Sequence, residues 1–322
     1  GSSAASDVYK RQEDARDFDD AICVTEKPDG RWELAVHIAD VSHYVKPDSV
    51  LDKEARKRGN SVYLADRVIP MLPEKLSNGV CSLKPYVERL THAAVMDFDS
   101  CGKMTKTRFV SAVIRSHHRY TYEQAYEQMM LTDEEVEAIE DEKQKQLTIR
   151  LKRAWELGSL LRERRYQNGA LDLDFAEVRV VLDEGGRAIG VKRSVYDESH
   201  QLIEEFMLAA NEAVAYETRN APAPSIYRVH EDPDPGKLEE FADLARSFGH
   251  RIGDMTHRPE LQKLLQSVKG NVEEHSIKVA LLRSLRRADY RAEPMGHYGL
   301  AKTNYTHFTS PIRRYADLVV HR

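Results

Sequence analysis

Apolar and polar residues alternate along the first third of the chain in a pattern typical of antiparallel strands. Runs 21–25 and 32–38 flank a Lys-Pro-Asp-Gly sequence at 27–30, and runs 91–99 and 104–114 flank a second, glycine-containing turn. Proline, aspartate and glycine in this order favour a tight turn between paired strands. The pattern therefore predicts two β-hairpins.

Other segments of the chain predict helices and shorter strands. An apolar stripe at helical spacing indicates helix over 121–165, and a glycine-rich turn at 183–186 indicates a third hairpin. Because antiparallel pairing dominates, the expected fold class is α+β, with a mixed, largely antiparallel sheet and surrounding helices. The further predicted strands are 67–72, 171–181, 188–193 and 225–230, and the further predicted helices are 49–58, 74–78, 199–219, 234–249, 259–265 and 273–287, with a last one that begins at Ser310 and Pro311.

No repeat, low-complexity tract or linker divides the 322 residues, of which 41% are hydrophobic. Residues 1–12 follow neither a strand nor a helix period, so we expect a non-native or disordered leader there. The last predicted helix stops at Arg322 without a capping residue. We therefore expect one domain over 13–322 that is truncated at its C-terminal end.

Charge and cysteine content exclude several classes of protein. A net charge of −5 gives no global nucleic-acid signature, so a polyanion would have to be bound by a local basic surface or through metal. Cys23, Cys81 and Cys101 are far apart, which supports neither a disulfide framework nor a zinc site. No apolar run is long enough for a membrane helix or a signal peptide. We expect a cytoplasmic protein.

The most unusual stretch is acidic and lies just before the first predicted strand. Asp17, Asp19 and Asp20 place three carboxylates within four positions. Such carboxylates repel each other when they are close, and Mg²⁺ is the usual counterion at phosphoryl-transfer sites. The spacing of a calcium loop is not met, because Ile22 and Pro28 stand where glycine and glutamate are needed. A solvated acidic turn is the simpler alternative, and strand alternation would separate Asp20 from the other two unless the backbone bends.

A second candidate site lies near the C-terminal end. Ser310 followed by Pro311 is typical of a helix start, where free backbone N–H groups can bind an anion. Arg313 and Arg314 would add two guanidinium groups beside it. Paired with an acidic metal cluster, this arrangement would form a phosphate clamp with Ser310, Arg313 and Arg314 as substrate-binding residues. Arginines that only cover a helix surface are the alternative.

Five sequence motifs follow one another along the chain. They are Asp14–Ala21, Val36–Ser42, Arg58–Tyr63, Ile69–Pro73 and Tyr305–Tyr315. Together and in this order they resemble the catalytic RNB domain of the ribonuclease II and ribonuclease R family, with more similarity to ribonuclease R. The resemblance extends over residues 13–322.

This resemblance implies a Mg²⁺-dependent hydrolytic exoribonuclease that degrades single-stranded RNA from the 3′ end to nucleoside 5′-monophosphates. It implies an RNB-type catalytic domain with an RNA channel, in which Asp17, Asp19 and Asp20 are the catalytic metal ligands and Asp19 is the most sensitive of them. Tyr63 matches the aromatic residue that stacks on the terminal base, and Arg313 matches the catalytic arginine beside the scissile phosphate. Beyond Mg²⁺ and RNA we expect no cofactor, no membrane contact and a monomer.

Two features keep other functions open. The family pattern has a fourth aspartate six residues before Asp17, where this chain has Arg11. A catalytically impaired RNA-binding fragment is therefore the first alternative, and a scaffold without affinity for RNA is the second. Tyr63 could also be a half-buried core residue. The histidines of the motifs are expected to be structural, because metal rather than a general base would activate water; they are His37, His43 and His307.

Overall fold

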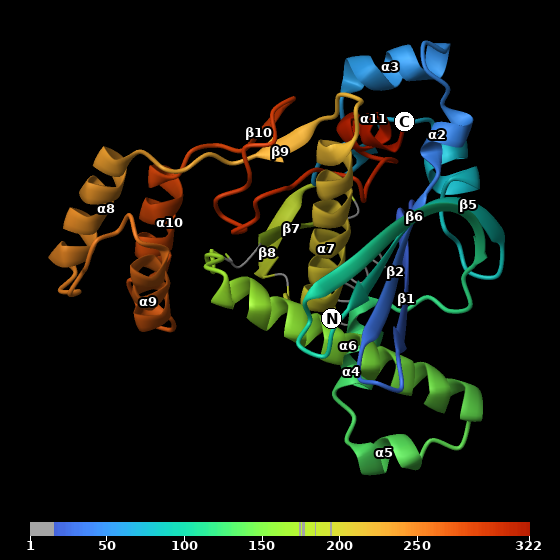
Figure 1. Cartoon of the computed structure of the whole chain (residues 1–322), viewed down its shortest axis with the longest axis horizontal. Helices are drawn as coiled ribbons and strands as arrows, with labels where there is room; N and C mark the ends of the chain where they lie inside the picture. The colour runs from blue at the N-terminus through green and yellow to red at the C-terminus, as the bar shows by residue number, and fades with distance from the viewer. Residues whose placement is uncertain (1–15, 174, 176–177, 184, 194) are drawn as a thin grey trace. The chain divides into compact units, whose positions relative to one another are not determined.

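The computed structural model describes residues 16–322 except 174, 176, 177, 184 and 194. The predicted leader, 1–12, and residues 13–15 lie outside the described part. The chain forms two compact units (Figure 1). The first contains the chain up to Leu161 together with 176–214 and 307–322, and the second contains the remainder. Two of the boundaries fall inside α6 (Glu142–Gln167) and α7 (Glu198–Asn220), where no linker composition marks them.

The first unit contains a four-stranded sheet with the strand order β1-β2-β5-β6. Its strands are β1 (Asp20–Glu26), β2 (Trp32–Ala39), β5 (Glu88–Phe98) and β6 (Met104–Arg115). Both predicted hairpins are confirmed, and β2 joins them by pairing with β5. Every pairing between strands in the described part of the chain is antiparallel, which confirms the predicted fold class.

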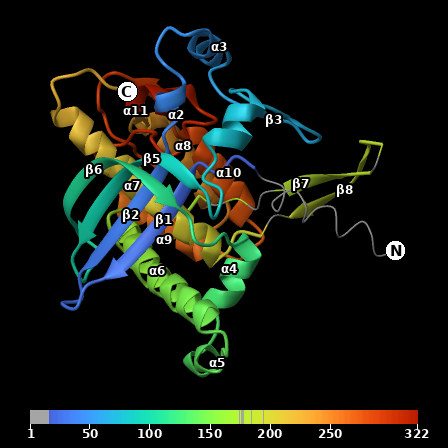
Figure 2. The same ribbon diagram turned by 90° about the vertical axis from the view of Figure 1, so that its right-hand side faces the viewer.

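Helices α6 and α7 cover one face of this sheet (Figure 2). Alternate residues of β2 point toward them, and Leu34, Val36 and Ile38 have no exposed surface. Leu157 of α6 and Phe206 of α7 meet these side chains and are equally buried. The apolar stripe expected at helical spacing therefore packs against the expected apolar face of the strands.

A second core of the first unit lies beneath short elements that surround the acidic stretch. The elements are α2 (Val41–Tyr44), α3 (Val50–Arg58), β3 (Val62–Tyr63), β4 (Val68–Ile69), the π-helix η1 (Lys75–Val80) and α11 (Tyr315–His321). Strand β4 is shorter than the predicted 67–72, and its partner β3 was not predicted, because two residues are too few to show alternation. The buried residues of this core include Ala39, Val41, Met71, Leu72, Ile312 and Leu318.

Capping residues explain why the helix predicted over 121–165 is divided. Thr121 and Thr132 each form a capping box, and these begin α4 (Tyr122–Met129) and α5 (Asp133–Glu137) before α6. The third hairpin is present as β7 (Val178–Leu182) and β8 (Ala188–Arg193), so the strand predicted from 171 begins later than expected.

The second unit is mainly helical. Helices α8 (Pro235–Ser247), α9 (Arg258–Val268) and α10 (Glu274–Ser284) enclose their own apolar core, and β9 (Tyr227–Val229) pairs with β10 (Asp289–Arg291). The core includes Leu238, Phe241, Leu261, Leu265, Ile277 and Leu281. In neither unit does a described helix combine the length and the apolar content that crossing a membrane requires.

The turn between β5 and β6 generates a stability prediction. Gly102 has φ +72°, and a Cβ there would lie 3.2 Å from Cβ of Leu160, whereas Gly30 has φ +75° and its nearest neighbour would be 3.9 Å away. Both alanine variants should lose about 1 kcal/mol through left-handed backbone strain. Gly102→Ala should lose roughly another 1 kcal/mol through crowding. Urea unfolding followed by circular dichroism measures the difference, and equal losses would contradict it.

Candidate active site

A buried serine fixes the backbone of the acidic stretch as it enters β1. The hydroxyl of Ser82 accepts a hydrogen bond from the backbone N–H of Phe18 (3.0 Å) and donates one to the carbonyl of Arg16 (2.6 Å). The N–H of Leu83 donates to the Phe18 carbonyl (2.9 Å). Because the Phe18 side chain packs against the second core, the aspartates on either side of it are held in place.

Asp19 is the most buried of the three predicted metal ligands, with 7% of its surface exposed. Its Oδ1 accepts a hydrogen bond from the Ile312 N–H (3.0 Å), and its Oδ2 lies 4.0 Å from Nε of Arg313. Burial raises the pKa of Asp19 well above its usual range. The Ile312 N–H and Arg313 act against this shift, and the charges of Asp20 and Asp317 add to it. The site therefore favours a cation beside Asp19.

One guanidinium acts on all three aspartates. Burial raises the pKa of Asp17 and raises that of Asp20 to about 6, and in both cases the charge of Arg313 acts in the opposite direction. The side chain of Arg313 is 42% exposed, and its Nη2 donates to Oγ of Ser310 (3.1 Å). The three predicted ligands thus lie near one guanidinium, that of Arg313, which an anion from solvent can still reach.

The aspartates are chemically suited to Mg²⁺ but do not form a ready-made cage. Among the residues that the structure describes, no three histidine, cysteine or acidic side chains are placed to hold a metal ion. Mg²⁺ usually binds through one or two carboxylates together with water and substrate phosphate, so three converging side chains are not required. The oxygen donors of Asp17, Asp19 and Asp20, and the pKa values that burial raises, fit a hard cation.

Tyr63 stands beside the acidic site because two chain segments pair there. The Ser61 N–H donates to the Arg313 carbonyl (2.9 Å), and the Tyr315 N–H donates to the Gly59 carbonyl (2.9 Å). Burial raises the pKa of Tyr63, and the charges of nearby aspartates add to the shift. With 55% of its surface exposed, Tyr63 offers its ring to solvent rather than to the core.

The predicted helix start at Ser310 and Pro311 is wrong. Helix α11 begins at Tyr315 and has only seven residues, and a turn precedes it. The Ser310 N–H, expected to face an anion, instead donates to Oδ1 of the buried Asp317 (2.7 Å). Arg314 also binds Asp317, so the two arginines of the predicted clamp have different surroundings. The substrate-binding roles of Ser310 and Arg314 stay predictions.

Tyr122 at the start of α4 lies close enough to the acidic site to sense its charges, and the sequence did not indicate this. Burial raises its pKa, the charge of Asp20 adds to the shift and Arg313 opposes it, so its hydroxyl lies within electrostatic range of both. Its ring stacks on His200 of α7 at 3.9 Å, and Nδ1 of His200 lies 2.9 Å from Oδ1 of Asp197. In the sequence, Tyr122 only follows the capping residue Thr121, and nothing in this pattern predicts that it lies near the acidic site.

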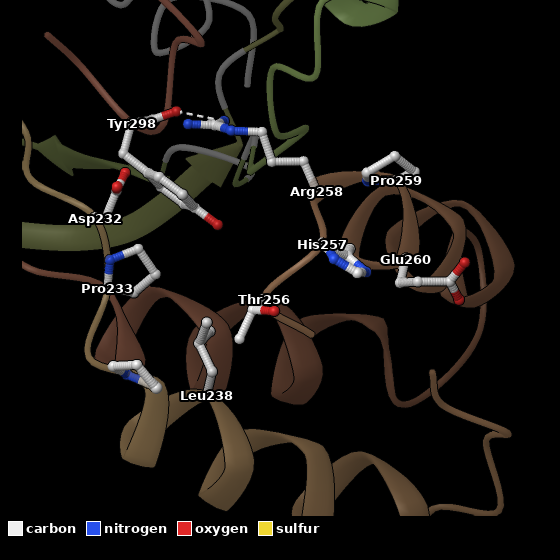
Figure 3. A pocket seen from close by; sticks show the side chains of 10 residues that line it. Asp232, Pro233, Leu238, Thr256, His257, Arg258, Pro259, Glu260 and Tyr298 are labelled. Atoms are coloured by element: carbon white, nitrogen blue, oxygen red, sulfur yellow. Dashed lines mark hydrogen bonds between the residues drawn. The ribbon is translucent and has the colours of Figure 1, made fainter. Parts of the chain in front are cut away.

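The second unit contains a separate cavity of about 680 Å³ (Figure 3). Its walls include Pro233, Leu238, Thr256 and Tyr298, and none of the predicted site residues lines it. The guanidinium of Arg258 lies 3.9 Å from the centre of the Tyr298 ring and donates to the Tyr298 carbonyl (2.7 Å). Asp232, His257 and Glu260 also line the cavity, so its walls combine apolar and ionisable side chains.

Comparisons with known proteins find similarity over nearly the whole chain, and thus over both units. The sequence profile of the RNB domain matches residues 11–322. Ribonuclease R of Thermotoga maritima is 47% identical over 313 residues, which cover 96% of this chain and 43% of that protein. The chain thus spans less than half the length of this relative.

Two solved structures are similar over nearly the whole chain. Mycoplasma genitalium RNase R in complex with ribose-methylated single-stranded RNA has a TM-score of 0.89 at 33% identity, covering 96% of this chain and 48% of that one. The same protein in complex with double-stranded RNA has a TM-score of 0.88 at 33% identity, covering 96% and 54%. The observed arrangement of helices and antiparallel strands is therefore that of a known nuclease region.

The role of Ser82 can be tested by removing its hydroxyl. Ser82→Ala leaves the buried Phe18 N–H and the Arg16 carbonyl without this partner, so it should destabilise the protein by about 1–3 kcal/mol. It should also speed hydrogen exchange in peptides that contain Phe18. Ser284→Ala is a matched control, because Ser284 donates to the Leu281 carbonyl (2.7 Å), which keeps a backbone partner. Unchanged exchange at Phe18 in Ser82→Ala would contradict the assignment.

Proposed function

Because the chain belongs to the RNB family, whose ribonuclease R members are its relatives, we propose that it hydrolyses single-stranded RNA from the 3′ end with Mg²⁺. We expect nucleoside 5′-monophosphates as products. Exoribonuclease activity is the function that the sequence, the fold and the site support best.

The observation that carries the proposal is the contact between Asp19 and the turn before α11. A carboxylate with 7% exposure faces a backbone N–H and a partly exposed guanidinium, and an exposed tyrosine lies beside them. Buried carboxylates of raised pKa in a polar site are typical of catalytic centres. The group at that site that could reach a phosphate is Arg313, and the group that could stack on a base is Tyr63.

Each residue would have a separate task in the reaction. Tyr63 would stack on the last base, which any base permits, since every base has a π-face. Arg313 would donate two parallel hydrogen bonds to the phosphate and stabilise the charge that develops there. Asp17, Asp19 and Asp20 would hold Mg²⁺, whose chemistry at such sites is to activate water and to offset phosphate charge. The structural roles expected for His37, His43 and His307 stay predictions.

The first alternative, an RNA-binding domain that does not cut, keeps one argument in its favour. No three described side chains form a metal cage, and Arg11, which replaces the fourth aspartate of the family pattern, lies outside the described residues. Single-stranded RNA is the expected partner in both cases. Turnover of oligo(A) in Mg²⁺ separates them, and absence of any RNA binding would leave the scaffold as the remaining function.

Replacing Asp19 by asparagine tests the catalytic site. Asp19→Asn removes the charge that would bind metal and keeps the shape of the side chain. Hydrolysis of 5′-labelled oligo(A) in Mg²⁺ should collapse, while binding measured in EDTA should survive because stacking and phosphate contacts supply it.

Asp29→Asn is the matched control, since Asp29 pairs with Arg31 in the exposed turn between β1 and β2. Its activity should equal that of the parent chain. If Asp19→Asn keeps more than a few per cent of the parental rate, Asp19 is not the central ligand.

Replacing Tyr63 tests the stacking role. Tyr63→Ala deletes a platform worth roughly 1–3 kcal/mol per base. Short substrates have few other contacts, so the shortest RNA left after digestion should lengthen by one or more nucleotides, as read on a sequencing gel. Tyr63→Phe keeps the ring and should give the parental end-product. An unchanged end-product in Tyr63→Ala would mean that Tyr63 serves packing instead.

A further inference from the structure

Asp317 of α11 is fully buried, and its carboxylate binds two separate points of the turn that precedes this helix. Oδ1 accepts from the Ser310 N–H (2.7 Å) and from Nη2 of Arg314 (2.7 Å), and Oδ2 accepts from Nε of Arg314 (2.8 Å). Two parallel bonds from one guanidinium fix its orientation as well as its position. The carboxylate therefore connects residue 310 with residue 314.

The residues between these two points are the ones that touch the acidic site. The turn is closed by the N–H groups of Arg313 (3.3 Å) and Arg314 (3.0 Å), which both donate to the Ser310 carbonyl. Inside it lie Ile312, whose N–H binds Oδ1 of Asp19, and the Arg313 side chain, which faces Oδ2. A change in the turn would move both groups together.

The two neighbouring arginines differ in what surrounds them. The Arg313 side chain is 42% exposed, and its nearest carboxylate oxygen is 4.0 Å away. The Arg314 side chain is 21% exposed and binds both oxygens of a carboxylate that has no exposed surface. A guanidinium in bidentate contact with a buried carboxylate is poorly placed to exchange it for a phosphate, because the carboxylate would lose its counterion.

We propose that Arg314 and Asp317 are positioning residues, whose ion pair shapes the turn 310–314 and so presents Ile312 N–H and Arg313 to Asp19. Arg314 does not bind substrate phosphate. This inference deepens the proposed function and rests on it for the RNA-binding and catalytic measurements, but not for hydrogen exchange. It replaces the earlier expectation that both arginines clamp the RNA.

Salt dependence of RNA binding separates positioning from phosphate contact. Each phosphate contact on a single strand contributes about −0.7 to the slope of log K against log salt concentration. With oligo(A) in EDTA, Arg313→Gln should make the slope shallower by about 0.7, and Arg314→Gln should leave it unchanged. Equal changes in both variants would overturn the proposal and return Arg314 to the RNA-binding surface.

Catalysis and hydrogen exchange test the turn itself. Arg314→Gln should lower kcat on the order of 10²-fold, the effect of a small misplacement, with little change in KM. In Arg314→Gln the buried Asp317 carboxylate loses its counterion. The double variant Arg314→Gln/Asp317→Asn removes this unpaired charge and should recover part of the loss in kcat. Parental kcat in both variants would overturn the proposal.

Hydrogen exchange in peptides that contain Ile312 gives a result even if the parent chain neither binds nor cuts RNA. A parent chain that neither binds nor cuts RNA would contradict the proposed function but not the positioning role. Exchange should speed up in Arg314→Gln, and unchanged exchange in a folded variant would overturn the positioning role. Arg246→Gln is the control in every measurement, because Arg246 forms an exposed pair with Asp243 three residues away. If Arg314→Gln does not fold, Arg314→Lys, which keeps the charge but loses the bidentate contact, replaces it in the kinetic and hydrogen-exchange measurements.

Discussion

The hydrogen bond between Ile312 N–H and Asp19 joins residues 293 positions apart, and the candidate site depends on it. It connects the segment that enters the first strand with the turn that precedes the last helix. A buried carboxylate needs partners to offset its lost hydration. The contact with Ile312 supplies one partner, and the nearby Arg313 supplies opposite charge. Further hydrogen bonds hold both chain segments in place, those of Ser82 on one side and those of Asp317 on the other.

Three acidic side chains near one arginine determine the electrostatics of the site. The pKa values of Asp17, Asp19 and Asp20 are all raised by burial, and Arg313 opposes each shift. A single guanidinium would not offset three ionised carboxylates, so the site in that state would favour a further cation. A hard divalent ion with oxygen ligands suits this demand. The chain belongs to the RNB family, and in the proposed function such an ion would serve catalysis.

Support for the reactive groups comes from residues that have no chemical task. Ser82 holds the backbone on one side of Asp19, and Asp317 holds the turn on the other. The pairing of Ser61 with Arg313 links that turn to the segment carrying Tyr63. Tyr63, Arg313 and the acidic cluster thus lie on one hydrogen-bonded framework within the first unit. Positions held by such a framework can be more precise than positions in unsupported loops.

The sequence by itself determined the local elements and the reactive residue types. Turn residues and alternation act over a few positions, so the hairpins around 27–30 and 100–103 could be predicted, as could most helices. The acidic stretch, Tyr63 and Arg313 were likewise recognisable from motif order. Only the tertiary structure decided what depends on distant contacts. That Arg314 binds the buried Asp317 whereas Arg313 faces Asp19 is visible only in the structure. The nearness of Tyr122 to Asp20 and Arg313 is another such contact, and two boundaries between the units fall within helices, where composition does not change.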